Sequence, residues 1–314
     1  MPLTAATLVT PEGEPLPDPQ ATSVEAQGWM RGFPPPPDKR IGFGAEPGYN
    51  AFPRNRWAFS HMRELVPTTN VWRGPGAPRP LPAAARPIDP RAVRFAAMGS
   101  GEEGNFADML LHTYADSVIV LHRGQVVYEA YWGEGRTERP HICYSVTKSF
   151  VGILAAALVA EGALDAQARV PHYLPELAGG AYADATLRDV MDMRIGVRYS
   201  EVYTDPRAEV HDYARAGGML PRPADYAGPG CFYDFLPTLR PQGAHGAGFS
   251  YKTVNTEVLA WVLRRVTGLP LAELVSQRIW RPIGAEQDAY FMVDAIGTES
   301  GGGGLNCTLR DLAR

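Results

Sequence analysis

The chain has 314 residues, of which 45% are hydrophobic and 20% are charged, and its formal net charge is −4. This composition is ordinary for a globular enzyme and excludes a basic surface for nucleic acid or anionic lipid. We expect a small-molecule partner, with a homodimer left open. The first residues lack the pattern of a signal peptide, and no apolar stretch reaches about 18 residues. We therefore predict a cytoplasmic protein that binds neither membrane nor nucleic acid.

The cysteines and histidines give no sign of a metal site or a disulfide framework. Cys143, Cys231 and Cys307 are widely spaced, without a Cys-x-x-Cys pair, and are expected to be small apolar core residues. The seven histidines show no metal-ligand spacing. We expect neither a metal nor a cofactor.

The first third of the chain is rich in proline and glycine. Residues 1–55 predict an irregular arm without a catalytic role, and residues 75–90 predict a second proline-rich linker. Between them, residues 55–62 are typical of a helix. Residues 92–114 predict a longer helix that leads into the sheet.

The middle of the chain begins with a predicted antiparallel hairpin. Residues 117–122 and 125–132 have strand composition and are joined at Arg123-Gly124, so the sheet is not built from βαβ units there. From Lys148 an apolar run predicts a helix buried on all sides. Capping boxes at Thr186 and Thr308 open further helices, and residues 254–267 form another that Gly268 ends.

Three common motifs fail on their context. Residues 99–104 fit Gly-x-Gly-x-x-Gly, but no good strand precedes them and the next strand turns back as a hairpin. Residues 246–253 resemble a phosphate-binding loop, but Tyr251 stands where a glycine is needed. His-Glu-x-x-His and Gly-x-Ser-x-Gly do not occur, which excludes zincins and α/β-hydrolases.

One motif remains, the chain's single Ser-x-x-Lys, formed by Ser145 and Lys148. At the start of a helix, this spacing puts the amine beside the hydroxyl on one face. The positive end of the helix dipole disfavours an ammonium there and favours an amine that can accept the serine proton. Only Lys39, Lys148 and Lys252 are lysines among 30 basic residues, and arginine cannot act as a base. A structural Ser/Lys pair is the alternative interpretation.

With these residues in place, the chain resembles the class C β-lactamase and esterase family of penicillin-recognising serine hydrolases. Within it, the similarity is closest to the 6-aminohexanoate-dimer (nylon-oligomer) hydrolases, and it covers about residues 50–314. The family similarity lies in residues 145–165, 171–177, 186–196, 251–268 and 301–314, and the similarity to the dimer hydrolases in residues 55–59, 203–206, 234–240 and 258–262.

The resemblance implies an α+β, β-lactamase/transpeptidase-like fold, in which an antiparallel sheet flanked by helices is joined to a mainly helical domain. Ser145 would be the nucleophile, Lys148 its base, and Tyr251 a phenol that relays protons. In the dimer hydrolases, a tyrosine matching Tyr203 closes on the substrate amide.

The resemblance also implies substrate-binding positions. Residues near Glu201 and Asp212 would shape the amine end of the substrate. The family's second element is commonly Tyr-x-Asn, whereas this chain has Thr253 at that place and an asparagine only at Asn255. Both are candidate substrate-binding residues, and the change argues against a penicillinase.

We expect a serine hydrolase that cleaves small linear amides or esters through an acyl-enzyme on Ser145. A β-lactamase or D-Ala-D-Ala peptidase, or a non-catalytic binding protein of the same fold, is the alternative. The expected domains are an arm (1–55), the first part of the sheet domain (56–150), a mainly helical domain (151–295) and a truncated return to the sheet (296–314).

The third family element, a Lys-Thr-Gly or His-x-Gly strand, does not occur before Arg314. We therefore expect the C-terminal strands to be missing, so that the hairpin has an unpaired edge and the 314-residue chain is an incomplete enzyme.

Overall fold

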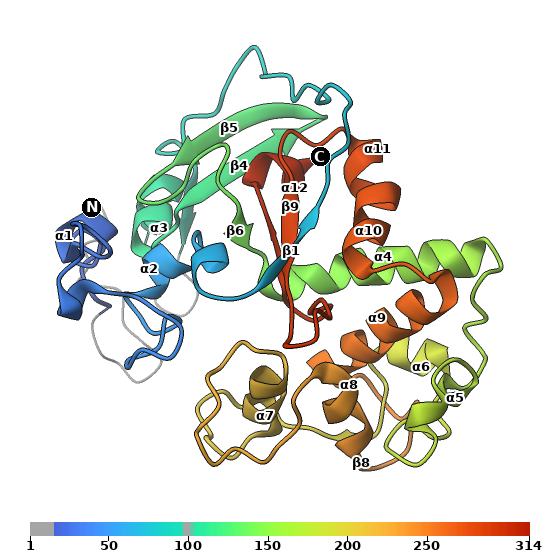
Figure 1. The fold of residues 1–314 in the computed structure, drawn as a ribbon. Coiled ribbons are helices and arrows are strands. Elements are labelled where there is room, and N and C mark those ends of the chain that lie inside the picture. The colour runs from blue at the N-terminus through green and yellow to red at the C-terminus, as the bar shows by residue number, and fades with distance from the viewer. Residues whose placement is uncertain (1–15, 97–100, 102) are drawn as a thin grey trace. The chain divides into compact units, whose positions relative to one another are not determined.

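The computed structural model describes residues 16–96, 101 and 103–314, which fall into two compact units (Figure 1). The first unit contains the chain up to Met62, residues 78–141 and residues 308–314, and the second contains residues 63–77 and 142–307. These units do not follow the domain boundaries expected from the sequence. The Ser-x-x-Lys segment belongs to the same unit as the helices that follow it.

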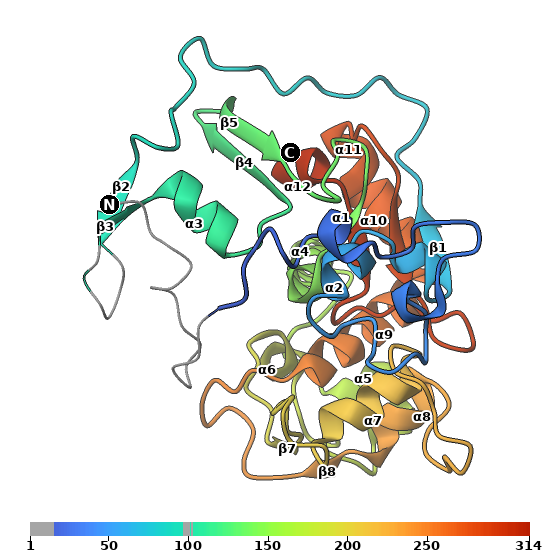
Figure 2. The same cartoon turned by 90° about the vertical axis from the view of Figure 1, so that its left-hand side faces the viewer.

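The hairpin of the first unit is formed as predicted. Strands β4 (Ser117–His122) and β5 (Gln125–Tyr131) pair antiparallel. Both turn residues, Arg123 and Gly124, have positive φ angles of 51° and 75°, as a tight hairpin turn requires. The edge of β5 that we expected to be unpaired is partly occupied, because the backbone of residues 82–88 hydrogen-bonds to it. Helix α12 (Leu309–Ala313) packs against β4 (Figure 2).

The region before the hairpin differs from the prediction. Instead of one helix over residues 92–114, β2 (Arg94–Ala96) pairs with β3 (Glu103–Asn105), and only α3 (Phe106–His112) is helical. Glycines oppose a helix here, and the Asn105 side chain accepts from the Asp108 N–H and so sets the helix start. The Gly-x-Gly-x-x-Gly match at 99–104 lies partly outside the described residues. Residues 1–15 of the arm lie wholly outside them.

The described part of the arm carries a small core of its own. It forms α1 (Val24–Gln27) and leads into α2 (Asn55–Ala58), which is shorter than the predicted helix. Trp29 and Ile41 are buried. The hydroxyl of Tyr114 donates to the Pro17 carbonyl at 2.7 Å, which ties the arm to the segment before β4.

The second unit is built on a four-stranded sheet with the order β1-β9-β10-β6. β9 pairs antiparallel with both of its neighbours, β1 and β10. All four side chains of β9 are buried, which explains its continuously apolar sequence. The strands are β1 (Thr68–Val71), β9 (Ala289–Met292), β10 (Leu305–Cys307) and β6 (His141–Ile142).

Helix α4 (Thr147–Ala160) packs against α9 (Thr253–Thr267) in this unit (Figure 1). The prediction that α4 is buried on all sides is wrong, because Ile153 is 60% exposed. In α9, by contrast, every residue from Thr253 to Leu263 is buried, and exposure begins only in the last turn. Gly268 ends it with a φ of 68°, as predicted.

Shorter elements complete the second unit. The predicted capping box at Thr186 is present at the start of α6 (Leu187–Met191). The remaining elements are α5 (Val170–Tyr173), β7 (Val197–Arg198), α7 (Glu209–Ala216), α8 (Phe232–Phe235), β8 (Arg240–Pro241), α10 (Leu271–Val275), the π-helical turn Ser276–Trp280 and α11 (Arg281–Ile283).

Candidate active site

Ser145 and Lys148 lie side by side at the start of α4. Ser145 is in a 3-10 turn, Tyr144–Val146, and α4 begins at Thr147, so the serine directly precedes the helix and does not lie within it. The Lys148 Nζ atom is 3.1 Å from the Ser145 Oγ atom and also donates to the carbonyl of Gly302 at 2.5 Å. Because Ser145 is exposed and hydrogen-bonded to an amine, its hydroxyl can be deprotonated and can meet a ligand.

The turn that carries Ser145 is fastened to β10. The Cys143 N–H donates to the Leu305 carbonyl at 2.8 Å, and the Thr147 hydroxyl accepts from the Leu305 N–H at 3.1 Å. Tyr144, between these anchors, has a φ of 43°, a left-handed conformation that costs energy for a tyrosine. The fold therefore holds the serine in a strained turn between two attachment points.

Tyr251 is also close to the lysine. The Lys148 Nζ atom is 5.1 Å from the centre of the Tyr251 ring, and Tyr251 is 44% exposed. The segment before α9 is held by its neighbours, because Ser250 N–H donates to the Met193 carbonyl at 2.8 Å and the Lys252 ammonium donates to the Val197 carbonyl. Burial lowers the pKa of Lys252. These contacts hold the Tyr251 ring beside the amine.

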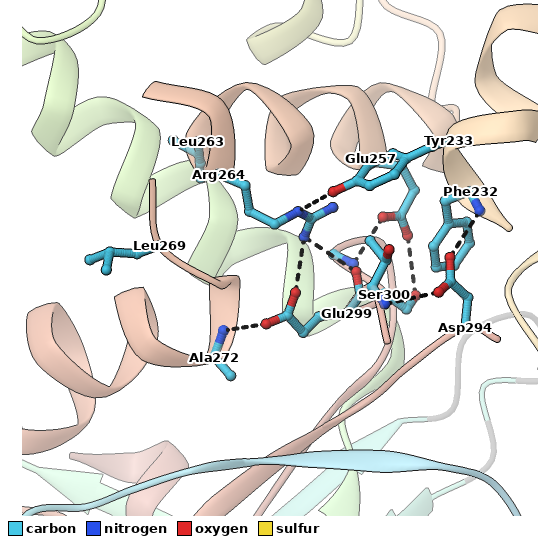
Figure 3. A network of polar contacts seen from close by, with 12 residues as sticks. Phe232, Tyr233, Glu257, Leu263, Arg264, Leu269, Ala272, Asp294, Glu299 and Ser300 are labelled. Atoms are coloured by element: carbon cyan, nitrogen blue, oxygen red, sulfur yellow. Dashed lines mark hydrogen bonds and ion pairs between the residues drawn. The ribbon is translucent and has the colours of Figure 1, made fainter. Parts of the chain in front are cut away.

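Glu257, which the sequence analysis did not single out, holds the segment that contacts Lys148. Its carboxylate is 1% exposed and accepts from the N–H groups of Gly301 and Gly302 at 3.0 and 2.8 Å. It also accepts from the hydroxyls of Ser300 at 3.1 Å and Tyr213 at 2.6 Å (Figure 3 shows Glu257 and Ser300). Burial, together with the Glu257 charge, raises the pKa of Tyr213 well above its ordinary value, so this hydroxyl stays protonated.

The approach of this segment to α9 requires glycine. A Cβ atom at Gly301 would lie 2.6 Å from the Ala260 Cβ, and one at Gly302 would lie 2.4 Å from the Thr253 Cγ2. Either contact is shorter than side chains allow. The close approach lets Glu257 reach both N–H groups and leaves the Gly302 carbonyl facing Lys148.

Two more buried carboxylates fix the chain just before the glycines (Figure 3). Glu299 accepts from the Ala272 N–H at 3.0 Å and forms an ion pair with Arg264 at 3.4 Å. Asp294 accepts from the N–H groups of Phe232 and Thr298 at 3.0 and 2.8 Å. One signal could have revealed Glu257 in the sequence, an acid in the middle of the apolar run of α9.

The expected substrate-binding residues divide into two groups. Tyr203 is 69% exposed, and partial burial together with the charges of Glu201 and Tyr251 raises its pKa. The Glu201 carboxylate accepts from the Thr253 N–H at the start of α9. Thr253 itself is 6% exposed, with its methyl group turned toward Gly302.

The other two expected residues, Asn255 and Asp212, have partners within the protein. Asn255, expected to bind substrate, is fully buried and accepts from the Tyr182 hydroxyl at 2.8 Å, so that expectation is corrected. It follows Thr253 by two residues, which turns it to another side of α9 and into the core. Asp212, on α7, forms an ion pair with Arg215 at 3.0 Å, and no contact in the described part of the chain links it to Ser145.

Residues 108–314 match the family model for the β-lactamases. The chain belongs to the β-lactamase family. It is 38% identical over 267 residues to the 6-aminohexanoate-dimer hydrolase of Paenarthrobacter ureafaciens, an alignment that covers 83% of this chain and 64% of that protein. The chain thus spans less than two thirds of the length of this curated family member.

A solved structure from the same family agrees with this assignment. It is a candidate 6-aminohexanoate-dimer hydrolase from Bacillus anthracis, 33% identical, with a TM-score of 0.76 over 85% of this chain and 69% of that one. The β-lactamase/transpeptidase-like fold expected from the sequence is confirmed.

Within the part of the chain that the structure describes, every helix falls short of the length or hydropathy needed to span a bilayer. In the same part, three or more potential metal-ligating side chains do not come together.

Proposed function

We propose that this β-lactamase-family protein is a serine hydrolase that cleaves small linear amides or esters. The observation that carries the proposal is the 3.1 Å contact between Lys148 Nζ and Ser145 Oγ at the start of α4. An amine at this distance can remove the hydroxyl proton while the oxygen attacks a carbonyl carbon.

The reaction proceeds in two halves. In the first, the Ser145 oxygen bonds to the substrate carbonyl, its proton passes to Lys148, and the amine or alcohol leaves with a proton delivered through Lys148 or Tyr251. In the second, water attacks the acyl-enzyme, gives up a proton to the same groups, and the Ser145–acyl bond breaks with the proton returned to Ser145. Tyr251 enters this step because its ring lies 5.1 Å from the Lys148 Nζ atom.

The substrates we propose are short linear amides similar to 6-aminohexanoate dimers. The 38% identity to the Paenarthrobacter ureafaciens hydrolase supports this class. Tyr203 supplies a hydroxyl and Glu201 a negative charge that helps to raise the pKa of Tyr203, which suits an amide whose far end carries an ammonium group.

The experiment that tests the proposal is labelling with a fluorophosphonate, followed by peptide mapping. We expect one label, on Ser145, and none in Ser145→Ala, which should remain folded because a hydroxyl at a helix start contributes only about 1 kcal/mol. In a separate assay, the unlabelled protein should release a burst of p-nitrophenol from a short ester. A label on another serine, or hydrolysis by Ser145→Ala, would refute the assignment.

A second assay separates this function from β-lactam hydrolysis. We expect turnover of nitrocefin to be negligible beside that of short esters, because Thr253 occupies the place of the family's asparagine and its side chain is buried. Nitrocefin turnover close to ester turnover would reverse this preference.

A further inference from the structure

Cys143, two residues before the candidate nucleophile Ser145, lies beside Cys307. The Sγ atoms of Cys143 and Cys307 are 3.4 Å apart, close enough for one thiol to donate a hydrogen bond to the other. The residues are adjacent because β6 leads into Cys143 while β10 ends at Cys307, and the Cys143 N–H bonds to Leu305 across the two strands. Cys307 is the core residue that the sequence predicts, and Cys143 packs against the same core, but the two thiols also contact each other.

The two thiols differ in exposure and reactivity. Cys143 is partly exposed, whereas Cys307 is 2% exposed. The hydrogen bond from Cys307 lowers the pKa of the Cys143 thiol, against the opposing effect of burial. Since the thiolate is the reactive form of cysteine, Cys143 is suited to attack an oxidant and Cys307 to resolve the product.

We propose that Cys143 and Cys307 form a reversible disulfide when the protein meets a hydroperoxide. The Cys143 thiolate attacks one peroxide oxygen, the O–O bond breaks, and Cys143 becomes a sulfenic acid with loss of water. The Cys307 sulfur then attacks the Cys143 sulfur, the S–O bond breaks, the S–S bond forms and a second water leaves. Two thiols and one hydrogen peroxide thus give one disulfide and two waters, with two electrons passing to the peroxide.

The disulfide would alter the turn that carries Ser145. The two sulfur atoms must close from 3.4 Å to about 2.05 Å. The backbone between them and Ser145 is already anchored to Leu305 and strained at Tyr144. A movement of this size displaces Ser145 from Lys148, and a misplacement of about 1 Å can slow a reaction about a hundredfold.

The primary test needs no enzyme activity. The 314-residue protein is treated with hydrogen peroxide, its remaining thiols are alkylated, and the tryptic digest is analysed by mass spectrometry without reduction. We expect the peptide ending at Lys148 joined to the peptide ending at Arg310, and Cys231 alkylated as before treatment. Cys231→Ser should still form the link, whereas Cys307→Ser should not. Sulfinic acid at Cys143 without the link, or a link through Cys231, would overturn the proposal.

A second readout tests the effect on the serine. We expect peroxide to slow fluorophosphonate labelling of Ser145 by about tenfold or more, with recovery after dithiothreitol, and to leave the labelling rate of Cys307→Ser unchanged. A link that forms without slowing labelling would refute the displacement of Ser145. This readout rests on the proposed function, so a protein whose Ser145 never reacts would count against the hydrolase, while the peptide link still decides the disulfide.

Discussion

Two segments of the second unit are held by the fold in different ways. Residues 294–304, the carboxylate-held segment, are tied down by buried acids and contact Lys148 through the Gly302 carbonyl. Residues 199–207, the tyrosine segment, carry Tyr203, which is 69% exposed. The difference teaches that the position of Lys148 depends on buried packing around it, whereas the tyrosine segment combines a buried core residue, Tyr199, with an exposed side chain, Tyr203.

The largest effect should follow from changing Lys148, which the carboxylate-held segment contacts through the Gly302 carbonyl. Lys148→Arg should be nearly as inactive as Lys148→Ala, because guanidinium stays charged and cannot take the serine proton. We expect acylation by p-nitrophenyl acetate to fall by about 10³-fold or more in both variants. The rate is measured by stopped flow. An arginine variant that keeps a tenth of the rate would mean that charge suffices.

The next effect tests the carboxylate-held segment itself. In Glu257→Gln, an amide replaces one acceptor oxygen and faces N–H groups it cannot accept from. We expect an unfolding free energy lower by about 2–4 kcal/mol. We also expect a kcat lower by about 10- to 100-fold, since the Gly302 carbonyl loses its position.

Urea unfolding and ester kinetics measure the two effects of Glu257→Gln. The matched control is Glu176→Gln, which removes an exposed carboxylate paired with Arg265 and should change stability by less than about 0.5 kcal/mol. A lower kcat with an unchanged KM in Glu257→Gln would indicate that Glu257 positions the base and does not act through substrate binding. A folded Glu257→Gln with normal kcat would show that the Gly302 contact is dispensable.

A smaller and more selective effect is expected from the tyrosine segment. Tyr203→Phe should slow amide hydrolysis by about tenfold, because an amine leaving group needs a proton. Hydrolysis of p-nitrophenyl esters should change by less than about twofold, because p-nitrophenolate leaves without one. The control is Tyr226→Phe, whose hydroxyl donates to Pro229. Equal losses on both substrates would assign Tyr203 to packing.

The smallest effect concerns the buried carboxylate of Asp116 in the first unit. It extends the comparison of buried acids to one whose pKa is raised. Burial raises the pKa of Asp116 to about 7, aided by Glu134 and Glu25 and opposed by Arg56. The folded state therefore holds a proton that the unfolded chain releases above about pH 4. The contribution of Asp116 to the unfolding free energy is therefore fully present below about pH 4 and is lost as the pH rises toward 7.

Asp116→Asn should accordingly be more stable than the parent at pH 8, by roughly 1–3 kcal/mol, and about equal at pH 4. Urea unfolding at both values measures it. Because His141 Nε2 lies 3.8 Å from the Asp116 carboxylate, His141→Gln in both backgrounds serves as the control. A stability difference that is the same at both pH values would contradict the raised pKa.

The features that were predicted well from the sequence are set by local patterns. The turn at Arg123-Gly124, the capping box at Thr186 and the end of α9 at Gly268 each depend on neighbouring residues, and the spacing of Ser145 and Lys148 depends on one helical turn. These features need no knowledge of distant packing.

What failed depended on distant partners. The role of Glu257 requires Gly301 and Gly302 to come against α9 from more than forty positions away. Asn255 was assigned to the substrate although Tyr182, far from it in sequence, binds it in the core. The helix expected over residues 92–114 is reduced to α3 because β2 and β3 pair with each other before it begins.

The run of four glycines before β10 also has a consequence for mutational tolerance. Side chains at 301, 302 and 304 would collide with Ala260, Thr253 and Ser300, within 2.8 Å in each case. At Gly303 a Cβ would meet only the Tyr144 backbone, at an ordinary 3.8 Å. A saturation library over these positions should therefore return glycine at three of them and diversity at 303. That residue is a place where new side chains can be grafted beside the serine turn without rebuilding the scaffold.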